Sequence, residues 1–292
     1  MKDDHLMKRI NRYDENIKRV AEHSSLVGLT VVEMCITEMC TRTCSFCPRS
    51  DKQVYPNRKL FMSEQTAENL ARSLASNTFV GDIHISGFGE SMTNKNIYNI
   101  INILRKHLPD NRIALTSNGD LLDVNIVNQL VDAGLSHMII SCYDGPTEYD
   151  VFNNMLNDSR LESYEIRELW LKDGETTLDM IKRNNFNNRS GAINIPEWKR
   201  EYNLNKPCYL PFYKMVIDWN GSVVLCCNDW LKRHGSLGNI NNTDVKDVWL
   251  NEQFTLVRNK LKNGDRSSPA CKFCNIQGDL VGEKSVNMLS SQ

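Results

Sequence analysis

The sequence lacks an excess of charge of either sign, and it lacks any long apolar run. Lysine and arginine total 35 and aspartate and glutamate total 36 among 292 residues, a net charge of −1. This balance excludes a nucleic-acid-binding protein that works through bulk basic charge. No segment approaches the roughly 20 apolar residues that cross a bilayer, and the charged first residues contain no apolar signal-peptide core. We therefore expect a cytoplasmic protein without nucleic-acid or membrane partners.

Cysteine is abundant, although the rest of the composition is that of an ordinary globular protein. Hydrophobic residues make up 40% and charged residues 24% of the sequence, and there are 10 cysteines. Reducing compartments seldom keep structural disulfides, so clustered cysteines there bind metals or carry out redox chemistry. All except Cys142 fall into an early and a late group: Cys35, Cys40, Cys44 and Cys47, then Cys208, Cys226, Cys227, Cys271 and Cys274.

Predicted strands and helices alternate over the first half of the chain. Apolar β-rich runs predict strands at 28–36, 82–90, 112–119 and 137–145. Apolar residues at helical spacing predict helices at 63–76, 93–108 and 123–134. Polar or glycine-rich segments follow the strands at 40–47, 87–90, 117–119 and 141–145. The alternation indicates an α/β fold with a parallel sheet, and such folds bind ligands at the carboxyl ends of their strands.

The middle of the chain has weaker signals. A further strand is predicted at 164–171 and a helix at 176–185. We expect the loops 144–165 and 184–200 to determine substrate specificity.

A second unit is predicted to begin near Pro207. Two β-rich runs around Asn220 and Gly221 indicate a hairpin over 214–227, and an amphipathic helix is predicted over 243–264. We expect four parts: a polar extension at 1–28, the α/β unit at 29–205, the second unit at 206–282, and a frayed tail at 283–292.

The early cysteine group has the spacing of a metal-binding loop. Three residues separate Cys40 from Cys44, and two separate Cys44 from Cys47. Iron–sulfur clusters are held by cysteine thiolates, and a four-iron cluster needs four of them to saturate its irons. Three thiolates would leave one iron open to another ligand. The alternative is a zinc site with Cys35 as fourth ligand.

This cysteine spacing, directly after the first strand and with an aromatic residue before the last cysteine, resembles the radical S-adenosylmethionine superfamily. The resemblance implies a partial (β/α)6 barrel over 29–205 and a [4Fe-4S] cluster on Cys40, Cys44 and Cys47. It also implies that the open iron binds S-adenosyl-L-methionine. An electron, from a flavodoxin- or ferredoxin-type donor, then cleaves this cofactor to a 5′-deoxyadenosyl radical.

The end of the strand predicted at 82–90 adds to the resemblance. Gly87, Phe88, Gly89 and Glu90 are similar to the family's Gly-Gly-Glu segment, although Phe88 departs from it. In the family this segment contacts the amino group of the cofactor, which implies that role for Gly87, Gly89 and Glu90. Glycines allow close backbone approach, and a carboxylate suits an ammonium.

The remaining strand ends supply further implied cofactor contacts. By the resemblance, Ser117 and Asn118 bind the ribose and carboxylate of S-adenosyl-L-methionine, and Phe46 lies beside its adenine. Ser141 and Tyr143 are expected at the same end of the barrel, Tyr143 with a catalytic role.

The late cysteine group supplies four soft ligands: Cys208, Cys226, Cys271 and Cys274. Four thiolates suit either tetrahedral zinc or a fully ligated iron–sulfur cluster. The pattern resembles the short "twitch" form of the SPASM extension, which implies a second, auxiliary [4Fe-4S] cluster in the unit 206–282.

Within the superfamily, residues 31–280 resemble the 2-deoxy-scyllo-inosamine dehydrogenases in the spacing of the last four cluster cysteines, in the segment 238–249 and in the Asn-Arg-x-Gly segment 188–191. In these an arginine holds the sugar-like substrate, which implies that role for Arg189. We therefore predict a radical oxidoreductase that oxidises a small sugar- or cyclitol-like metabolite through the auxiliary cluster.

Three alternatives stay open. An epimerase would use Cys227, the extra thiol beside Cys226, as its hydrogen-atom donor. A ribosomal-peptide-modifying enzyme would act on a peptide instead. A structural metal-binding module would have no activity.

Overall fold

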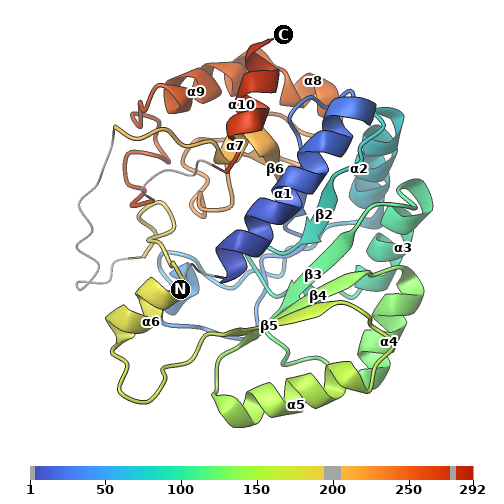
Figure 1. The fold of residues 1–292 in the computed structure, drawn as a ribbon, viewed down its shortest axis with the longest axis vertical. Helices are drawn as coiled ribbons and strands as arrows, with labels where there is room; N and C mark the ends of the chain where they lie inside the picture. The colour runs from blue at the N-terminus through green and yellow to red at the C-terminus, as the bar shows by residue number, and fades with distance from the viewer. Residues whose placement is uncertain (1–3, 194–204, 277–280, 292) are drawn as a thin grey trace.

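The computed structural model describes residues 4–193, 205–276 and 281–291, and its strands form one open sheet (Figure 1). The strands are β1 (Val31–Met34), β2 (Asp82–Ile85), β3 (Ile113–Ser117), β4 (His137–Cys142), β5 (Tyr164–Glu168), β6 (Lys214–Ile217) and β7 (Val223–Val224). Their order in the sheet is β5-β4-β3-β2-β1-β6-β7, and every neighbouring pair is parallel except β6 and β7. The predicted α/β fold with a parallel sheet is confirmed.

Helices connect the parallel strands and flank the sheet. They are α1 (Asp4–His23), α2 (Glu64–Ser76), α3 (Ile97–His107), α4 (Val124–Ala133), α5 (Pro146–Asn157), α6 (Thr177–Arg183), α7 (Leu210–Tyr213), α8 (Val245–Trp249), α9 (Glu252–Lys262) and α10 (Glu283–Ser290). Two 3-10 turns, η1 (Pro48–Ser50) and η2 (Ser91–Thr93), follow β1 and β2. In the described part of the chain, no helix has both the length and the apolar character to cross a membrane.

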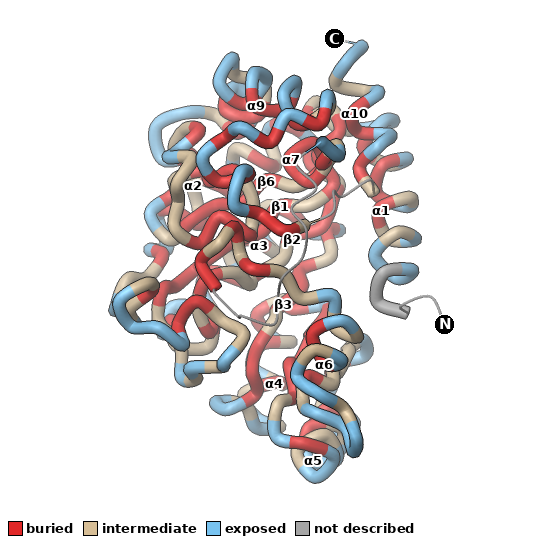
Figure 2. The backbone as a smooth tube through the Cα atoms, turned by 90° about the vertical axis from the view of Figure 1, so that its left-hand side faces the viewer, coloured by how far each residue is buried: buried red, intermediate tan, exposed pale blue. Residues whose placement is uncertain are grey.

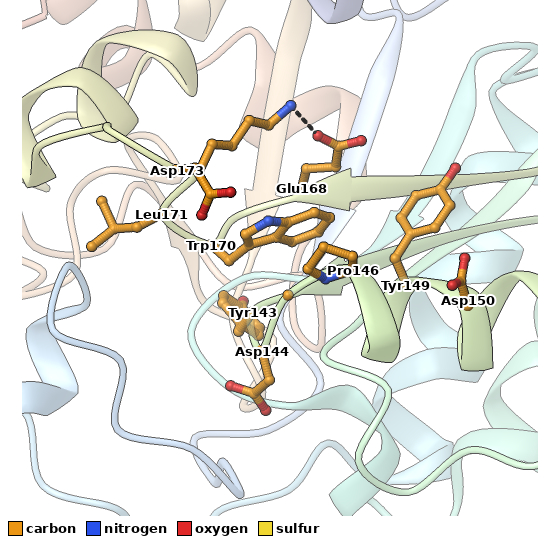
Figure 3. Close-up of a pocket in the computed structure, with 11 residues that line it drawn as sticks. Tyr143, Asp144, Pro146, Tyr149, Asp150, Glu168, Trp170, Leu171 and Asp173 are labelled. Atoms are coloured by element: carbon orange, nitrogen blue, oxygen red, sulfur yellow. Dashed lines mark ion pairs between the residues drawn. The ribbon is translucent and has the colours of Figure 1, made fainter.

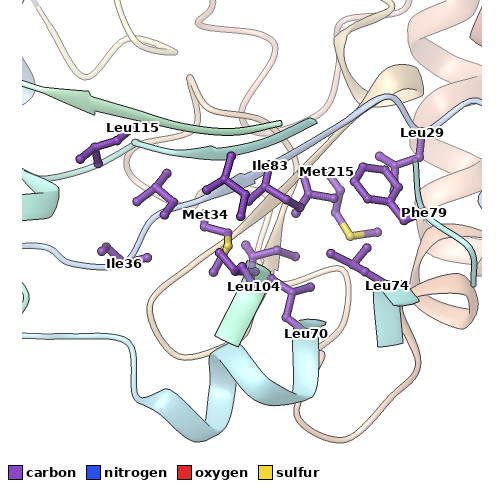
Figure 4. Close-up of a cluster of buried hydrophobic side chains, with 14 of the residues drawn as sticks. Leu29, Met34, Ile36, Leu70, Leu74, Phe79, Ile83, Leu104, Leu115 and Met215 are labelled. Atoms are coloured by element: carbon purple, nitrogen blue, oxygen red, sulfur yellow. The ribbon is translucent and has the colours of Figure 1, made fainter. Parts of the chain in front are cut away.

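One face of the sheet is apolar and forms the core with α2 and α3. Alternate strand residues such as Met34, Ile83 and Leu115 point to this face and are fully buried. They pack against Leu70 of α2 and Leu104 of α3 (Figure 4). Each such burial contributes about 1.5–3 kcal/mol, so this face anchors the sheet. Buried residues accordingly follow β1, β2 and β3 in Figure 2.

The other face of the sheet is polar, and we call it the polar face. The registers of the six parallel strands place the following side chains on it: Glu33, His84, Ser86, Thr116, Ser141, Arg167 and Lys214. A polar layer on a largely buried surface requires internal partners or a polar ligand.

Helix α1 packs at the amino ends of the strands. Arg12 contacts Asp82 at the start of β2, with 2.8 Å between Nη2 and Oδ1, and Asn16 donates to the carbonyl of Thr30. The Tyr13 hydroxyl lies 2.9 Å from the Ser285 hydroxyl of α10. The expected fraying of 283–292 is therefore wrong, because α10 is ordered by this contact and its Val286 is buried.

Three further elements differ from the prediction. Residues 146–157, expected within a loop, form helix α5. The segment 243–264 is two helices rather than one, because Asn251 caps the start of α9 by accepting from the amide of Phe254. The predicted hairpin is present, but its strand β6 pairs with β1 and so extends the first sheet. The predicted boundary near residue 205 follows residues 194–204, which lie outside the described part.

Candidate functional site

The three early cysteines lie in the loop that follows β1, before η1. Burial, and then the charges of Cys47 and Cys40, raises the pKa of the Cys44 thiol to about 12. The thiols are thus close enough to repel one another as thiolates, and they ionise together when they share a cation. This donor set fits an iron–sulfur cluster, which thiolates hold.

Side-chain contacts that the sequence did not reveal hold this loop in place. The guanidinium of Arg42, within the cysteine motif, contacts Asp120 after β3 (2.6 Å) and Glu148 in α5 (2.9 Å). Asn57 accepts from the amide of Cys40 at 2.8 Å and donates to its carbonyl at 2.9 Å. These contacts therefore hold the loop against the segments that follow β3 and β4.

The glycines after β2 are required by close packing against the same region. A Cβ added to Gly87, whose φ is +106°, would lie 2.1 Å from the Cys35 sulfur, and one added to Gly89 would lie 2.5 Å from the carbonyl oxygen of Met39. Cys35 itself is fully buried beneath Gly87, in an apolar cluster with Phe88. The structure thus places Cys35 in side-chain packing.

Gly87→Ala is expected to destabilise the protein by roughly 1–3 kcal/mol, the cost of overpacking, beyond the strain of its backbone conformation. Gly145→Ala is the matched control, because Gly145 has a similar φ of +101° and open space around its Cβ position. Denaturant unfolding of both variants measures the difference. Equal losses would show that the Cys35 contact is unimportant.

Glu90 connects the glycine segment to the end of β3. Its carboxylate is buried and accepts hydrogen bonds from the Ser117 hydroxyl (2.9 Å), the Asn118 amide (2.7 Å) and the Met92 amide (3.1 Å). Burial raises the pKa of Glu90, and these hydrogen bonds oppose the shift. The structure therefore brings Glu90, Ser117 and Asn118 together, as expected for one binding surface.

Asn118 and the aromatic residues extend this surface to the cysteine loop. The Asn118 side-chain amide donates to Thr41 at 2.7 Å and lies 4.0 Å from the Cys40 sulfur. The Phe46 ring stacks on Tyr143, with centroids 5.9 Å apart. Ser141 hydrogen-bonds Tyr143 and opposes the burial that raises its pKa. The predicted residues Phe46, Ser141 and Tyr143 thus lie together at the carboxyl end of β4.

A cavity of about 670 Å³ opens beside Tyr143 (Figure 3). Aromatic side chains, Tyr149 of α5 and Trp170 after β5, stand on its walls with Asp144 and Asp150. Such a cavity suits a ligand with a flat ring and hydroxyl groups.

The late cysteines form a second thiol cluster. Burial, and then the charges of Cys208 and Cys274, raises the pKa of Cys271 to about 12. Burial also raises the pKa of Cys226, with contributions from Cys227, Cys271 and Cys274. No three cysteine, histidine or acidic side chains of the described residues are spaced as ligands of a single metal ion. The charges of the four predicted ligands nevertheless act on one another.

Arg189 acts electrostatically on one thiol from each cysteine group. Its charge lowers the pKa of both Cys47 and Cys227, against the larger effect of burial. Its backbone has a left-handed φ of +47°, which is uncommon for a non-glycine residue, and its guanidinium donates to Asn228 at 3.1 Å. Cys227 is also within electrostatic reach of Glu33 and Lys214 on the polar face.

Comparison with known families accounts for both clusters. A model of the radical SAM superfamily matches residues 34–188, more than half of the chain. The chain belongs to the radical SAM superfamily. A model described as an iron–sulfur cluster-binding domain, SPASM, matches residues 208–275, which include all four late ligands predicted for this radical SAM protein.

Relatives of this radical SAM protein support the same assignment. It is 26% identical over 248 residues to the S-adenosyl-L-methionine-dependent 2-deoxy-scyllo-inosamine dehydrogenase of Niallia circulans, covering 84% of this chain and 92% of that protein. The structure of BtrN in complex with AdoMet and 2-DOIA matches with a TM-score of 0.68 and 25% identity, covering 85% of this chain and 94% of BtrN. Native anSMEcpe with bound AdoMet shares the fold, with a TM-score of 0.55 and 12% identity, covering 90% of this chain and 96% of that one.

The radical SAM protein is accordingly an enzyme, and the alternative of a structural metal-binding module is set aside. Its cofactors are S-adenosyl-L-methionine, a [4Fe-4S] cluster and an auxiliary iron–sulfur cluster.

Proposed function

We propose that this radical SAM oxidoreductase dehydrogenates a carbon that bears a hydroxyl group on a small aminocyclitol or related polyol. The observation that carries the proposal is that Cys47 and Cys227, one thiol from each cysteine group, pack against the same cluster of buried residues. The Arg189 guanidinium donates to Asn228, the residue after Cys227. A substrate held by Arg189 would lie between the two proposed clusters. The similarity to a 2-deoxy-scyllo-inosamine dehydrogenase over 92% of its length supports the substrate class.

The proposed cofactor ligands follow from the thiol clusters. Cys40, Cys44 and Cys47 would hold the first cluster, and Cys208, Cys226, Cys271 and Cys274 the auxiliary one. When bound, the first cluster and S-adenosyl-L-methionine would supply hydrogen-atom abstraction from substrate carbon, and the auxiliary cluster would supply an acceptor for the second electron as the hydroxyl proton leaves to solvent.

The protein's own residues position the reactants. Glu90 retains acceptor capacity for the cofactor ammonium beyond its bonds to Ser117, Asn118 and Met92, since a carboxylate accepts about four hydrogen bonds. Gly87 and Gly89 would allow the backbone to approach the cofactor closely. Arg189 would hold substrate hydroxyls through its guanidinium donors.

The cavity beside Tyr143 is proposed to take the nucleoside end of S-adenosyl-L-methionine. Its aromatic walls suit adenine, and Asp144 and Asp150 suit ribose hydroxyls. Phe46 and Tyr143 join this cavity to the cysteine loop. Electron supply by a flavodoxin- or ferredoxin-type protein and a cytoplasmic location remain predictions.

Epimerisation is the second candidate function. The Cys227 thiol lies near Glu33, Lys214 and Arg189, so it could return a hydrogen atom to a substrate bound on the polar face.

Incubation of the reconstituted enzyme with 2-deoxy-scyllo-inosamine in deuterated buffer separates these reactions. We expect a product lighter by about two daltons, because dehydrogenation removes two hydrogen atoms from the substrate. Mass spectrometry measures the product. Solvent deuterium retained at carbon would establish epimerisation instead, and absence of any substrate conversion would contradict both functions.

A further inference from the structure

An ion pair lies on the polar face, outside the residues assigned to the cofactor. The Lys214 ammonium, at the start of β6, lies 2.7 Å from the Glu33 carboxylate in β1. The Ser86 hydroxyl, after β2, donates to the other Glu33 oxygen at 2.9 Å. The ion pair of Glu33 and Lys214, which we call the floor pair, is therefore supported by a third residue, Ser86, from the end of the neighbouring strand.

The floor pair keeps unused hydrogen-bonding capacity. A carboxylate accepts about four hydrogen bonds and an ammonium donates three. Among the described residues, Glu33 accepts two side-chain hydrogen bonds and Lys214 donates one, to Glu33. The two side chains retain 7% and 17% exposure, so a small ligand can reach them.

The charge state of the floor pair suits ligand binding rather than proton transfer. Burial is the largest single effect and opposes ionisation of Glu33, but Lys214, His84 and the Ser86 hydrogen bond together lower the pKa of Glu33 to about 2. The neighbouring His84 is neutral near pH 7, because burial lowers its pKa to about 4. Glu33 is therefore a fixed anionic acceptor, a poor proton acceptor, and well matched to an ammonium or hydroxyl donor.

The floor pair also borders the two cysteine groups. Cys47 and Cys227 pack against one buried cluster that contains Cys35 and Val216. These two residues follow Glu33 and Lys214 by two positions, so they point to the same face of the sheet. A ligand bound between the cysteine groups would therefore face the floor pair.

We infer that the floor pair is a substrate subsite that binds two adjacent substituents of the ring, an amine or hydroxyl donating to Glu33 and a hydroxyl accepting from Lys214. This rests on the proposed function and deepens it. The subsite restricts substrates to vicinal amino alcohols and diols, and it favours the amine because Glu33 is anionic.

The test measures dissociation constants for 2-deoxy-scyllo-inosamine and scyllo-inositol by calorimetry on anaerobic holoenzyme with S-adenosyl-L-methionine. Glu33→Gln is expected to weaken binding of the amine by about tenfold or more, the size of a lost charge-assisted hydrogen bond, and to remove the preference over the inositol. The double variant Glu33→Gln with Lys214→Met removes both charges together, so that no unpaired buried charge is left. It is expected to lose the same preference.

Asp82→Asn is the matched control, because Asp82 is a buried carboxylate at the start of β2 that pairs with Arg12 and Arg112 instead. Its dissociation constants are expected to stay at wild-type values. Wild-type preference in the folded double variant would overturn the floor-pair subsite alone. Failure of the wild type to bind any cyclitol would overturn the subsite together with the proposed function.

Discussion

Cys44→Ala is expected to abolish reductive cleavage of S-adenosyl-L-methionine and to lower the iron content from about eight to about four per chain, one four-iron cluster being lost. The reason is that Cys44 lies between Cys40 and Cys47 in a loop whose thiols already act on one another. Two thiolates cannot keep the cluster in place. Iron analysis of anaerobically reconstituted protein and chromatography of 5′-deoxyadenosine measure both effects.

Cys142→Ala is the control for this prediction. Cys142 is a buried thiol in β4 that contacts Glu148 and belongs to neither cysteine group. Its replacement should leave about eight irons. Retention of eight irons by Cys44→Ala would show that the early loop does not hold the cluster.

Lys232→Met is expected to lower the free energy of unfolding by about 3–5 kcal/mol, because it leaves buried carboxylates without their positively charged partner. Lys232 contacts the carboxylates of both Glu38 and Asp218, which are only 2% and 3% exposed. These contacts join the segment after Cys226 to the loop before Cys40. Guanidinium chloride unfolding of the anaerobic protein measures the loss.

Lys284→Met is the matched control, since Lys284 pairs with Asp14 at the surface and both side chains are substantially exposed. Exposed pairs contribute about 0–1 kcal/mol. Similar losses for the two lysines would contradict a stabilising role for the buried contacts of Lys232.

The fold could largely be read from local patterns. The strands β1 to β4 and the helices α2 to α4 have clear periodicity, and Ser63 and Gly134 cap helix ends close to the predicted bounds. Helix α5 was missed because its glycine and proline start looks like a turn and its buried residues are few. The pairing of β6 with β1 joins residues about 180 positions apart, and no local signal specifies such a contact.

The candidate site was predictable where motifs are short in sequence. The cysteines, Glu90 and the Ser117–Asn118 pair could be found in this way. Arg42, Lys214 and Lys232 could not, because their partners are contributed by distant segments. The role of a single charged residue in a strand or loop can be assigned only after the fold shows which oppositely charged residue lies beside it.

Cys40, Cys44 and Cys47 are proposed to hold a four-iron cluster with one iron open to S-adenosyl-L-methionine. Electron–nuclear double resonance of the reduced enzyme with cofactor labelled by ¹⁷O in its carboxylate tests this proposal directly. We expect hyperfine coupling between the label and the cluster. A spectrum without that coupling, from protein whose early loop carries zinc, would contradict it.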